Sequence, residues 1–256
     1  MLYIIGLGLE PNCKDLSLKG LKALKNSDVV YFEGYTSNID YDFSSLKKIC
    51  GKEIISLSRE DVEVKNIPVE EAKGKVVSFL VPGDPLFATT HKEIIIECVN
   101  QKIDCKVINA PSILTVCGKT GLSLYKFGRV VSIPFVNEEK GYLPTTPYLY
   151  LKKNFENGLH TLILLDIGML PNEAIEILLN MEKKVKREGK QGESFFKNKR
   201  LFVCSRMNHE DEKIYYLKVE DLKNYEFGKG PHCLIFPANM EFHEEEFLKV
   251  VINGKC

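Results

Sequence analysis

Three short turns rich in glycine and proline are the places where this sequence could bind a ligand. They are Gly6-Leu7-Gly8, Gly83-Asp84-Pro85 and Ala110-Pro111-Ser112-Ile113. Glycine lets a backbone turn sharply and approach a ligand closely. Each turn follows a strand-like apolar run, and ligands of open α/β sheets bind beyond the carboxyl ends of the strands. The spacing therefore predicts one crevice shared by the three turns.

The first turn resembles a dinucleotide-binding loop only in part. Gly6-Leu7-Gly8-Leu9-Glu10-Pro11 lacks the third glycine of G-x-G-x-x-G. Glu33 follows the second apolar run, roughly where an acid that binds ribose would lie. This pattern is a weak nucleotide signal and does not favour NAD.

The remaining candidates for chemistry are five histidines, and none predicts a catalytic or metal site. His209 and His243 lie beside acidic clusters that are typical of exposed segments, whereas His91, His160 and His232 lie at element boundaries. The chain contains no phosphate-binding P-loop, no H-E-x-x-H and no G-x-S-x-G. We expect structural histidines and no metal.

The elements that must position the turns alternate between strand and helix in the first half of the chain. Short apolar runs predict strands, and apolar residues three or four apart predict helices, the first of them capped by Asp15 or Ser17. Expected strands are Leu2–Leu7, Val29–Phe32, Ile54–Leu57, Lys75–Val81 and Cys105–Asn109. Expected helices start near Leu18 and Phe43 and cover His91–Asn100. This alternation predicts a mainly parallel sheet with helices on both faces.

After Pro111 a second series of elements begins. Expected strands are Val130–Phe135, Thr161–Asp166, Arg200–Met207, Ile214–Leu217 and Cys233–Phe236. Expected helices are Ile113–Lys119, Tyr148–Phe155, Asn172–Lys186 and Phe242–Val251. We therefore predict two α/β domains, residues 1–110 and 111–256, with a boundary near Asn109–Ser112. The basic stretch Lys183–Arg200 is interpreted as a solvated loop in preference to a partner-docking patch.

The composition is that of a globular protein with no net charge. Of 256 residues, 44 % are hydrophobic and 27 % charged, as in soluble domains. Thirty-five basic residues balance 35 acidic ones, which argues against a dedicated nucleic-acid binder. No apolar run is long enough for a membrane helix, and the apolar N-terminus lacks a basic leader, so we expect a cytoplasmic location. The eight cysteines form no C-x-x-C pair, and we expect neither disulfides nor structural zinc.

Six ordered blocks of the sequence resemble the diphthine synthases, methyltransferases of diphthamide biosynthesis within the tetrapyrrole methylase superfamily. They are MLYIIGLGL (Met1–Leu9), YFEGYTS (Tyr31–Ser37), PGDPLFATTH (Pro82–His91), NAPSI (Asn109–Ile113), LSLYKFGRVVSIPF (Leu122–Phe135) and GLHTLILLDI (Gly158–Ile167). The first and third blocks are typical of the superfamily. The EGYTS, ATTH, LYKFG and GLHTLILLDI segments are specific to the diphthine synthases, and PHCLIF (Pro231–Phe236) resembles their last strand.

The resemblance implies a two-domain tetrapyrrole-methylase-like α/β fold, a homodimer, and S-adenosyl-L-methionine bound in the cleft between the domains. It places the cofactor contacts on Leu9, Asp84, Phe87, Ser112, Ile113, Leu165, Met207 and His232. Most of these contacts are expected through the backbone, beside an apolar wall. S-adenosyl-L-homocysteine is the implied product.

The sequence departs from the family pattern in three places. Glu10 stands where the family usually has glycine, which predicts a tighter or displaced first loop. Leu86-Phe87 is bulkier than in some relatives, and Gly168–Pro171 replaces a longer stretch containing proline and arginine.

The implied substrate is a protein, elongation factor 2, with a 3-amino-3-carboxypropyl histidine whose amino nitrogen accepts methyl groups. A sulfonium methyl is already activated, so the reaction needs little from side chains beyond alignment and exclusion of water. Asp166 is the candidate for orienting the amine or accepting its proton; the alternative is a turn residue at a strand end. Two other functions stay open: another methyltransferase of the superfamily, or a cofactor-binding partner of the translation factor without turnover.

Overall fold

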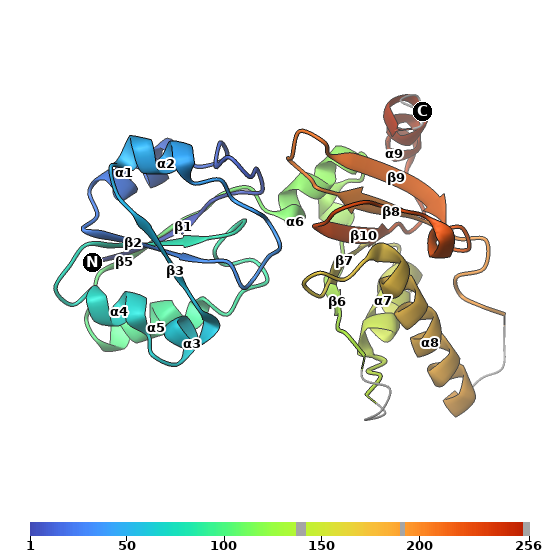
Figure 1. Ribbon diagram of the computed structural model, residues 1–256. Coiled ribbons are helices and arrows are strands. Elements are labelled where there is room, and N and C mark those ends of the chain that lie inside the picture. Colours follow the sequence, from blue (N-terminus) through green and yellow to red (C-terminus); the bar gives the residue numbers. More distant parts are fainter. Residues whose placement is uncertain (137–141, 190–192, 253–256) are drawn as a thin grey trace. The chain divides into compact units, whose positions relative to one another are not determined.

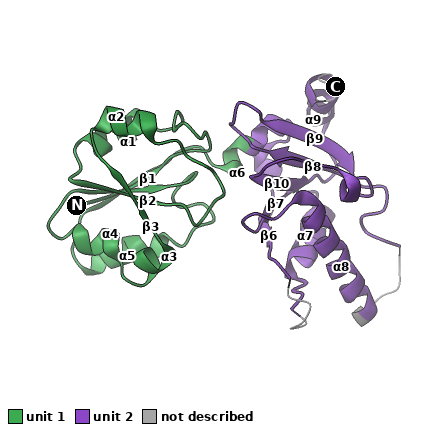
Figure 2. Ribbon diagram, in the orientation of Figure 1, with its two compact units in different colours: residues 1–116 green, residues 117–256 purple. Residues whose placement is uncertain are grey.

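The computed structural model describes residues 1–136, 142–189 and 193–252, which fold as two compact units. Unit 1 comprises Met1–Val116 and unit 2 comprises Cys117–Cys256 (Figure 2). The predicted boundary near Asn109–Ser112 lies just before the short helix α6 (Ile113–Val116), which is part of unit 1.

Unit 1 is built on a five-stranded parallel sheet. The strands are β1 (Leu2–Gly6), β2 (Val29–Glu33), β3 (Ile54–Leu57), β4 (Val77–Val81) and β5 (Cys105–Ile108), and their order is β3-β2-β4-β1-β5. All four pairings are parallel, which confirms the predicted sheet type. The five residues of the central strand β4 are all buried, as expected for a strand covered on both faces.

Helices cover both faces of this sheet (Figure 1). On one face lie α1 (Leu18–Lys25) and α2 (Ser44–Cys50), which share a core cluster through Leu24 and Leu46. On the other lie α3 (Arg59–Glu63), α4 (Ile67–Glu71) and α5 (Lys92–Asn100), whose apolar residues form a second cluster with the sheet. The Ser17 hydroxyl accepts a hydrogen bond from Gly20 N and caps α1, as predicted. The five-residue helices α3 and α4 were not predicted, because they are too short for a helical period to show.

Unit 2 contains a mixed five-stranded sheet of order β6-β7-β10-β8-β9. Its strands are β6 (Val131–Ile133), β7 (Thr161–Leu165), β8 (Arg200–Ser205), β9 (Lys213–Lys218) and β10 (His232–Phe236). Only β6 and β7 pair in parallel; β10 lies antiparallel to both β7 and β8, and β8 to β9. The strand predicted to reach Met207 ends at Ser205 because Arg206 has a left-handed φ of 52°.

The helices of unit 2 are α7 (Thr146–Glu156), α8 (Pro171–Gly189) and α9 (Phe242–Phe247). One face of α8, including Ala174, Leu178 and Met181, packs into the main core of the unit with the sheet and Tyr148 of α7. Shorter turns are η1 (Cys117–Thr120), η2 (Leu124–Lys126), η3 (Leu222–Asn224) and the π-helical η4 (Leu248–Ile252). The helix predicted over Phe242–Val251 thus changes winding after Phe247.

Two observations concern the described residues as a set. None of their helices has the length and apolar character that crossing a membrane requires. The seven described cysteines, all except Cys256, carry free thiols.

Candidate functional site

The three predicted turns meet at one edge of the unit 1 sheet. They follow β4, β1 and β5, which are neighbours in a parallel sheet, so their carboxyl ends lie side by side. A Cβ added at Gly6 would lie 2.5 Å from Gly83 O and 2.8 Å from Ala110 Cβ. Glycine at position 6 therefore allows all three turns to touch.

The first two turns are joined through their backbones. Gly83 N donates to Gly8 O at 2.8 Å, and Gly8 N donates to Gly83 O at 3.2 Å. Both glycines have left-handed φ values, 76° at Gly8 and 62° at Gly83, which side chains disfavour. The two predicted turns thus form a small fixed bridge.

Tyr41 supports this bridge, and the sequence analysis missed it. Its hydroxyl donates to Gly8 O at 2.6 Å and also accepts from Gly83 N at 3.4 Å. The ring packs edge-on against Phe32 and stacks with Phe43. Tyr41 lies in a segment without helix or strand, so no periodic pattern marked it; the cluster of three aromatic residues was the available signal.

Asp84 ties the second turn to the third. Its Oδ1 accepts from Leu86 N at 3.0 Å, and its Oδ2 accepts from Asn109 Nδ2 at 2.9 Å and from Ala110 N at 3.4 Å. The carboxylate is thus committed to the shape of the loops. An effect of Asp84 on a ligand would act mainly through the backbone that it holds.

The other predicted contacts of unit 1 lie on the same loops. Leu9, Phe87 and Ile113 are half-buried, and Ser112 is buried. Ser112 begins α6, since its carbonyl accepts from Val116 N at 3.0 Å. The structure therefore brings all five predicted residues of unit 1 to one edge of its sheet.

Glu10, the residue that departs from the family pattern, forms hydrogen bonds within the first loop. Its carboxylate accepts from Asn12 Nδ2 at 2.8 Å and from Lys14 N at 3.0 Å, and its side chain is largely buried. Asp15 Oδ2 accepts from the backbone N–H groups of Leu9 and Glu10. These bonds hold the first loop; that it is tighter than, or displaced from, the loops of relatives stays a prediction.

In unit 2 the strand register gathers the remaining predicted residues at one end of the sheet. Because β10 runs against β7 and β8, its first residues lie beside the last residues of both: Cys233 pairs with Leu164, and His232 with Ser205. Leu165, Asp166, Met207 and His232 all lie at this end.

His232 has a defined proton arrangement. Its Nε2 lies 3.3 Å from Gly228 O, which can only accept, so Nε2 carries the proton. Its Nδ1, 2.8 Å from Ser205 Oγ, then accepts from that hydroxyl. Burial lowers the pKa of His232, although the hydrogen bond to Gly228 opposes this. The imidazole is therefore neutral at pH 7 and offers a flat, uncharged wall.

Asp166 has the contacts of a turn residue. Its Oδ1 accepts from Ile167 N at 2.9 Å and its Oδ2 from Phe135 N at 3.3 Å, which joins the ends of β7 and β6. The side chain is nevertheless exposed at the same end of the sheet as His232. A role toward an amine stays a prediction.

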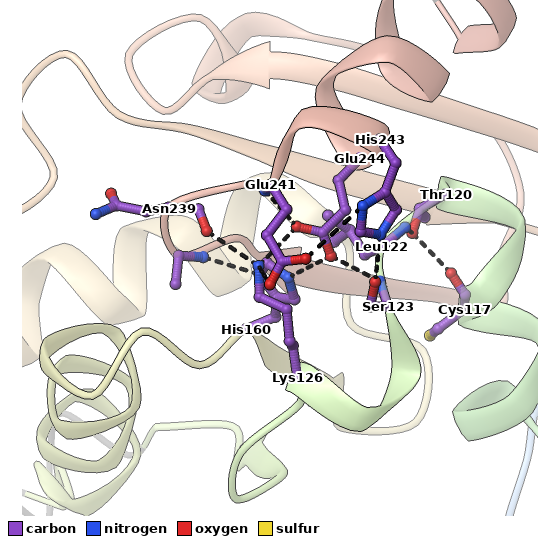
Figure 3. Close-up of polar contacts among 11 residues, drawn as sticks. Cys117, Thr120, Leu122, Ser123, Lys126, His160, Asn239, Glu241, His243 and Glu244 are labelled. Carbon is purple, nitrogen blue, oxygen red and sulfur yellow. Dashed lines mark hydrogen bonds and ion pairs between the residues drawn. The ribbon is translucent and has the colours of Figure 1, made fainter.

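The opposite end of the unit 2 sheet carries a second polar cluster, which is structural (Figure 3). Glu244 of α9 is buried and accepts from Lys126 Nζ at 2.7 Å, Ser123 N at 2.8 Å and Glu241 N at 2.8 Å. His160 Nδ1 accepts from Ala238 N at 3.0 Å, so its Nε2 is the donor to Glu244 Oε1 at 3.1 Å. The LYKFG and GLHTLILLDI motifs thus meet α9 here.

Comparison with known proteins identifies the fold. The profile of the family described as Tetrapyrrole (Corrin/Porphyrin) Methylases matches residues 1–223. The chain belongs to the tetrapyrrole methylase family. It is therefore a methyltransferase with S-adenosyl-L-methionine as methyl donor, which confirms the reaction and cofactor predicted from the sequence motifs.

Individual members of the tetrapyrrole methylase family are similar over almost the whole chain. The diphthine synthase of Methanocaldococcus jannaschii is 42 % identical over 97 % of this chain and 98 % of its own length. That of Methanococcus aeolicus is 40 % identical over 97 % of each chain. A crystal structure of a diphthine synthase superposes with a TM-score of 0.86 at 32 % identity, covering 98 % of this chain and 96 % of the other.

The residues present fit the cofactor of a tetrapyrrole methylase. In unit 1 the two glycine turns keep the backbone close and fixed, and Leu9 and Phe87 on the same loops are half-buried apolar residues. In unit 2 Leu165, at the end of β7, is half-buried as well. Asp84 and His232 are both held by protein partners. This is the composition expected of a site that binds through backbone groups and apolar walls.

Proposed function

We propose that this methyltransferase acts in diphthamide biosynthesis on elongation factor 2. The observation that carries the proposal is the 42 % identity to a diphthine synthase over 97 % of the chain. The substrate is the 3-amino-3-carboxypropyl histidine of the factor, and the product is diphthine or its methyl ester. The EGYTS and LYKFG segments, specific to the diphthine synthases, favour this substrate over a tetrapyrrole.

The cofactor contacts in this proposal lie on both units. Unit 1 supplies Leu9, Asp84, Phe87, Ser112 and Ile113, and unit 2 supplies Leu165, Met207 and His232. The positions of these residues support the proposal, because the residues of each unit gather at one end of that unit's own sheet. Asp84 holds two loops together, and neutral His232 would offer an uncharged surface to a cofactor that carries a cationic sulfonium.

The chemistry asks for positioning more than for acid or base groups. When bound, the cofactor supplies an activated methyl group. The protein must hold an amine in line with it and exclude water, and such alignment can contribute about 7–11 kcal/mol to lowering the barrier. The exposed carboxylate of Asp166 is suited to accept a hydrogen bond from the substrate amine and so orient its lone pair.

We further propose that the enzyme is a cytoplasmic homodimer whose protein partner is elongation factor 2. The substrate is a translation factor, and the neutral total charge gives no support for direct binding of nucleic acid. We expect no association with a membrane.

Intact mass spectrometry tests the function. Elongation factor 2 bearing the 3-amino-3-carboxypropyl histidine is incubated with this protein and S-adenosyl-L-methionine. A gain of three methyl groups supports formation of diphthine, and a gain of four supports the methyl ester. No gain, with cofactor binding verified by calorimetry, contradicts the proposed substrate; another methyltransferase substrate or a non-catalytic partner role would then explain the binding.

A further inference from the structure

A buried carboxyl group and a buried imidazole face each other in unit 1, outside the contacts assigned above. Glu33 ends β2 and His91 precedes α5, and their side chains are 0 % and 1 % exposed. Strands β2 and β4 are neighbours, so the loop after β2 lies beside loop 82–91 after β4. The two residues belong to the EGYTS and ATTH motifs.

Glu33 accepts hydrogen bonds from the loop that follows β2. Its Oε2 accepts from the backbone N–H groups of Tyr35 and Thr36, both at 3.1 Å. Its Oε1 accepts from Thr36 Oγ1 at 2.5 Å. The same Oε1 lies 3.7 Å from His91 Nε2.

His91 holds loop 82–91, and its tautomer follows from its partners. Its Nδ1 lies 3.3 Å from Pro85 O, and a carbonyl can only accept, so Nδ1 carries a proton. In the neutral ring Nε2 then presents a lone pair to Glu33. Among the described residues, His91 Nε2 has no hydrogen-bond partner. An ionised Glu33 would therefore place a negative charge against this lone pair in a buried site, which is unfavourable.

The surroundings favour a neutral carboxyl. Burial raises the pKa of Glu33 to about 7, since the hydrogen bonds from Thr36 and Tyr35 and the charge of Arg59 on α3 offset it only in part. Burial also lowers the pKa of His91, against the bond to Pro85 and the charge of Glu63 on α3. The other neighbours are rings: Phe79 of β4 lies edge-on to His91, and the Tyr35 ring lies under Arg59. With a pKa of about 7, Glu33 carries its proton below pH 7, which avoids a buried anion beside the lone pair of His91.

We propose that Glu33 and His91 are positioning residues of the methyl transfer: with Glu33 neutral, this buried pair, 3.7 Å apart, keeps loop 82–91 in the form that receives the cofactor. The inference rests on the proposed cofactor contacts of Asp84 and Phe87, which lie on this loop. Neither Glu33 nor His91 contacts the cofactor in this proposal.

The proposal has a defined pH dependence. Above pH 7 Glu33 loses its proton, the buried anion faces the lone pair of His91, and the loop is held less well. Cofactor affinity then falls as pH rises. If only the protonated form binds, the apparent Kd rises about tenfold between pH 6 and pH 8.

Calorimetry with S-adenosyl-L-homocysteine tests this between pH 6 and pH 8. Binding of this cofactor product avoids the ionisation of the substrate amine, which would complicate a pH profile of activity. Wild type should show the rise in Kd. Glu33→Gln, whose amide has nearly the same shape and stays neutral at every pH, should bind as wild type does at pH 6 and lose the pH dependence. Glu63→Gln removes a nearby charge and should keep it.

A histidine spectrum provides the second readout. ¹⁵N-labelled His91, assigned by its loss in His91→Gln, should be neutral and protonated at Nδ1 between pH 6 and pH 8. An imidazolium in that range, or binding by wild type that does not change with pH, would overturn the proposal while leaving the proposed function intact. Absence of binding at every pH would instead contradict the cofactor contacts themselves.

Discussion

The hydroxyl of Tyr41 contacts both glycine turns of unit 1, in addition to their backbone bonds, which makes Tyr41 a direct test of the proposed cofactor loops. Tyr41→Phe keeps the ring against Phe32 and Phe43 and removes the hydroxyl, which donates to Gly8 O at 2.6 Å and accepts from Gly83 N at 3.4 Å. Gly8 O still accepts from Gly83 N, so the loss should be moderate. One hydrogen bond contributes about 1 kcal/mol, and we expect affinity for S-adenosyl-L-homocysteine to fall about fivefold by calorimetry. The control Tyr125→Phe, at an 80 % exposed residue, should change nothing.

The carboxylate of Asp84 makes a second prediction possible at the same loops. Asp84→Ala frees Leu86 N, Ala110 N and the Asn109 amide at once, and should weaken cofactor binding. We expect the loss of these hydrogen bonds to weaken the binding free energy of the cofactor by about 2 kcal/mol, which is roughly a thirtyfold rise in Kd.

Asn109→Ala tests whether the loss in Asp84→Ala comes from loosened loops or from a lost direct contact between Asp84 and the cofactor. If Asp84 acts by holding the loops, Asn109→Ala should also weaken binding, by less. Asp104→Ala, at an exposed residue of unit 1, is the control. Calorimetry with unchanged affinity in Asp84→Ala would remove Asp84 from the cofactor contacts.

Helix α9 is joined to the unit 2 sheet by one buried carboxylate. Burial by itself would raise the pKa of Glu244, but hydrogen bonds from Lys126, Glu241, Ser123 and His160 outweigh it and lower the pKa from 4.5 to about 2. This stabilisation is present above pH 4.5 and is lost as pH falls toward 2. Glu244→Gln should therefore lower the free energy of unfolding by about 3 kcal/mol at pH 7, measured by urea titration.

The pH dependence distinguishes this interaction from simple packing. The difference between wild type and Glu244→Gln should stay constant from pH 7 to about 5 and shrink below it, because only the wild type titrates. Glu246→Gln, at an exposed residue of the same helix, is the matched control. An equal difference at pH 7 and pH 3 would show that the charge of Glu244 does not stabilise α9.

At the scale of the whole molecule, the proposed protein substrate allows a prediction about how the two proteins associate. The basic stretch Lys183–Arg200 includes the end of α8 and residues 190–192, which lie outside the described residues. Exposed Lys183, Arg187, Lys197 and Arg200 could steer an acidic surface of the substrate. Reversing these four charges should slow association with elongation factor 2 at low salt, by about tenfold or more in stopped-flow measurements, with little effect at high salt. Unchanged association at low salt would leave the interpretation as a solvated loop.

The elements that could be predicted are those whose pattern is local. Mainly apolar runs such as Val77–Val81 identify buried parallel strands, and the 3.6-residue period of Asn172–Lys186 identifies α8. Helices α3 and α4 have about one turn each, too little for a period. The strand ending at Ser205 was predicted too long because a left-handed residue leaves no trace in hydrophobicity.

The sequence by itself determined the parallel sheet of unit 1, the family, and the turns that carry the proposed cofactor contacts, since motifs and strand ends are written in consecutive residues. Only the tertiary structure decided how those residues are held. Tyr41 reaches Gly8 across 33 positions, Glu33 faces His91 across 58, and Glu244 bonds to Lys126 across 118. Such contacts depend on which strands become neighbours, and strand order is set by packing of the whole chain rather than by any local pattern.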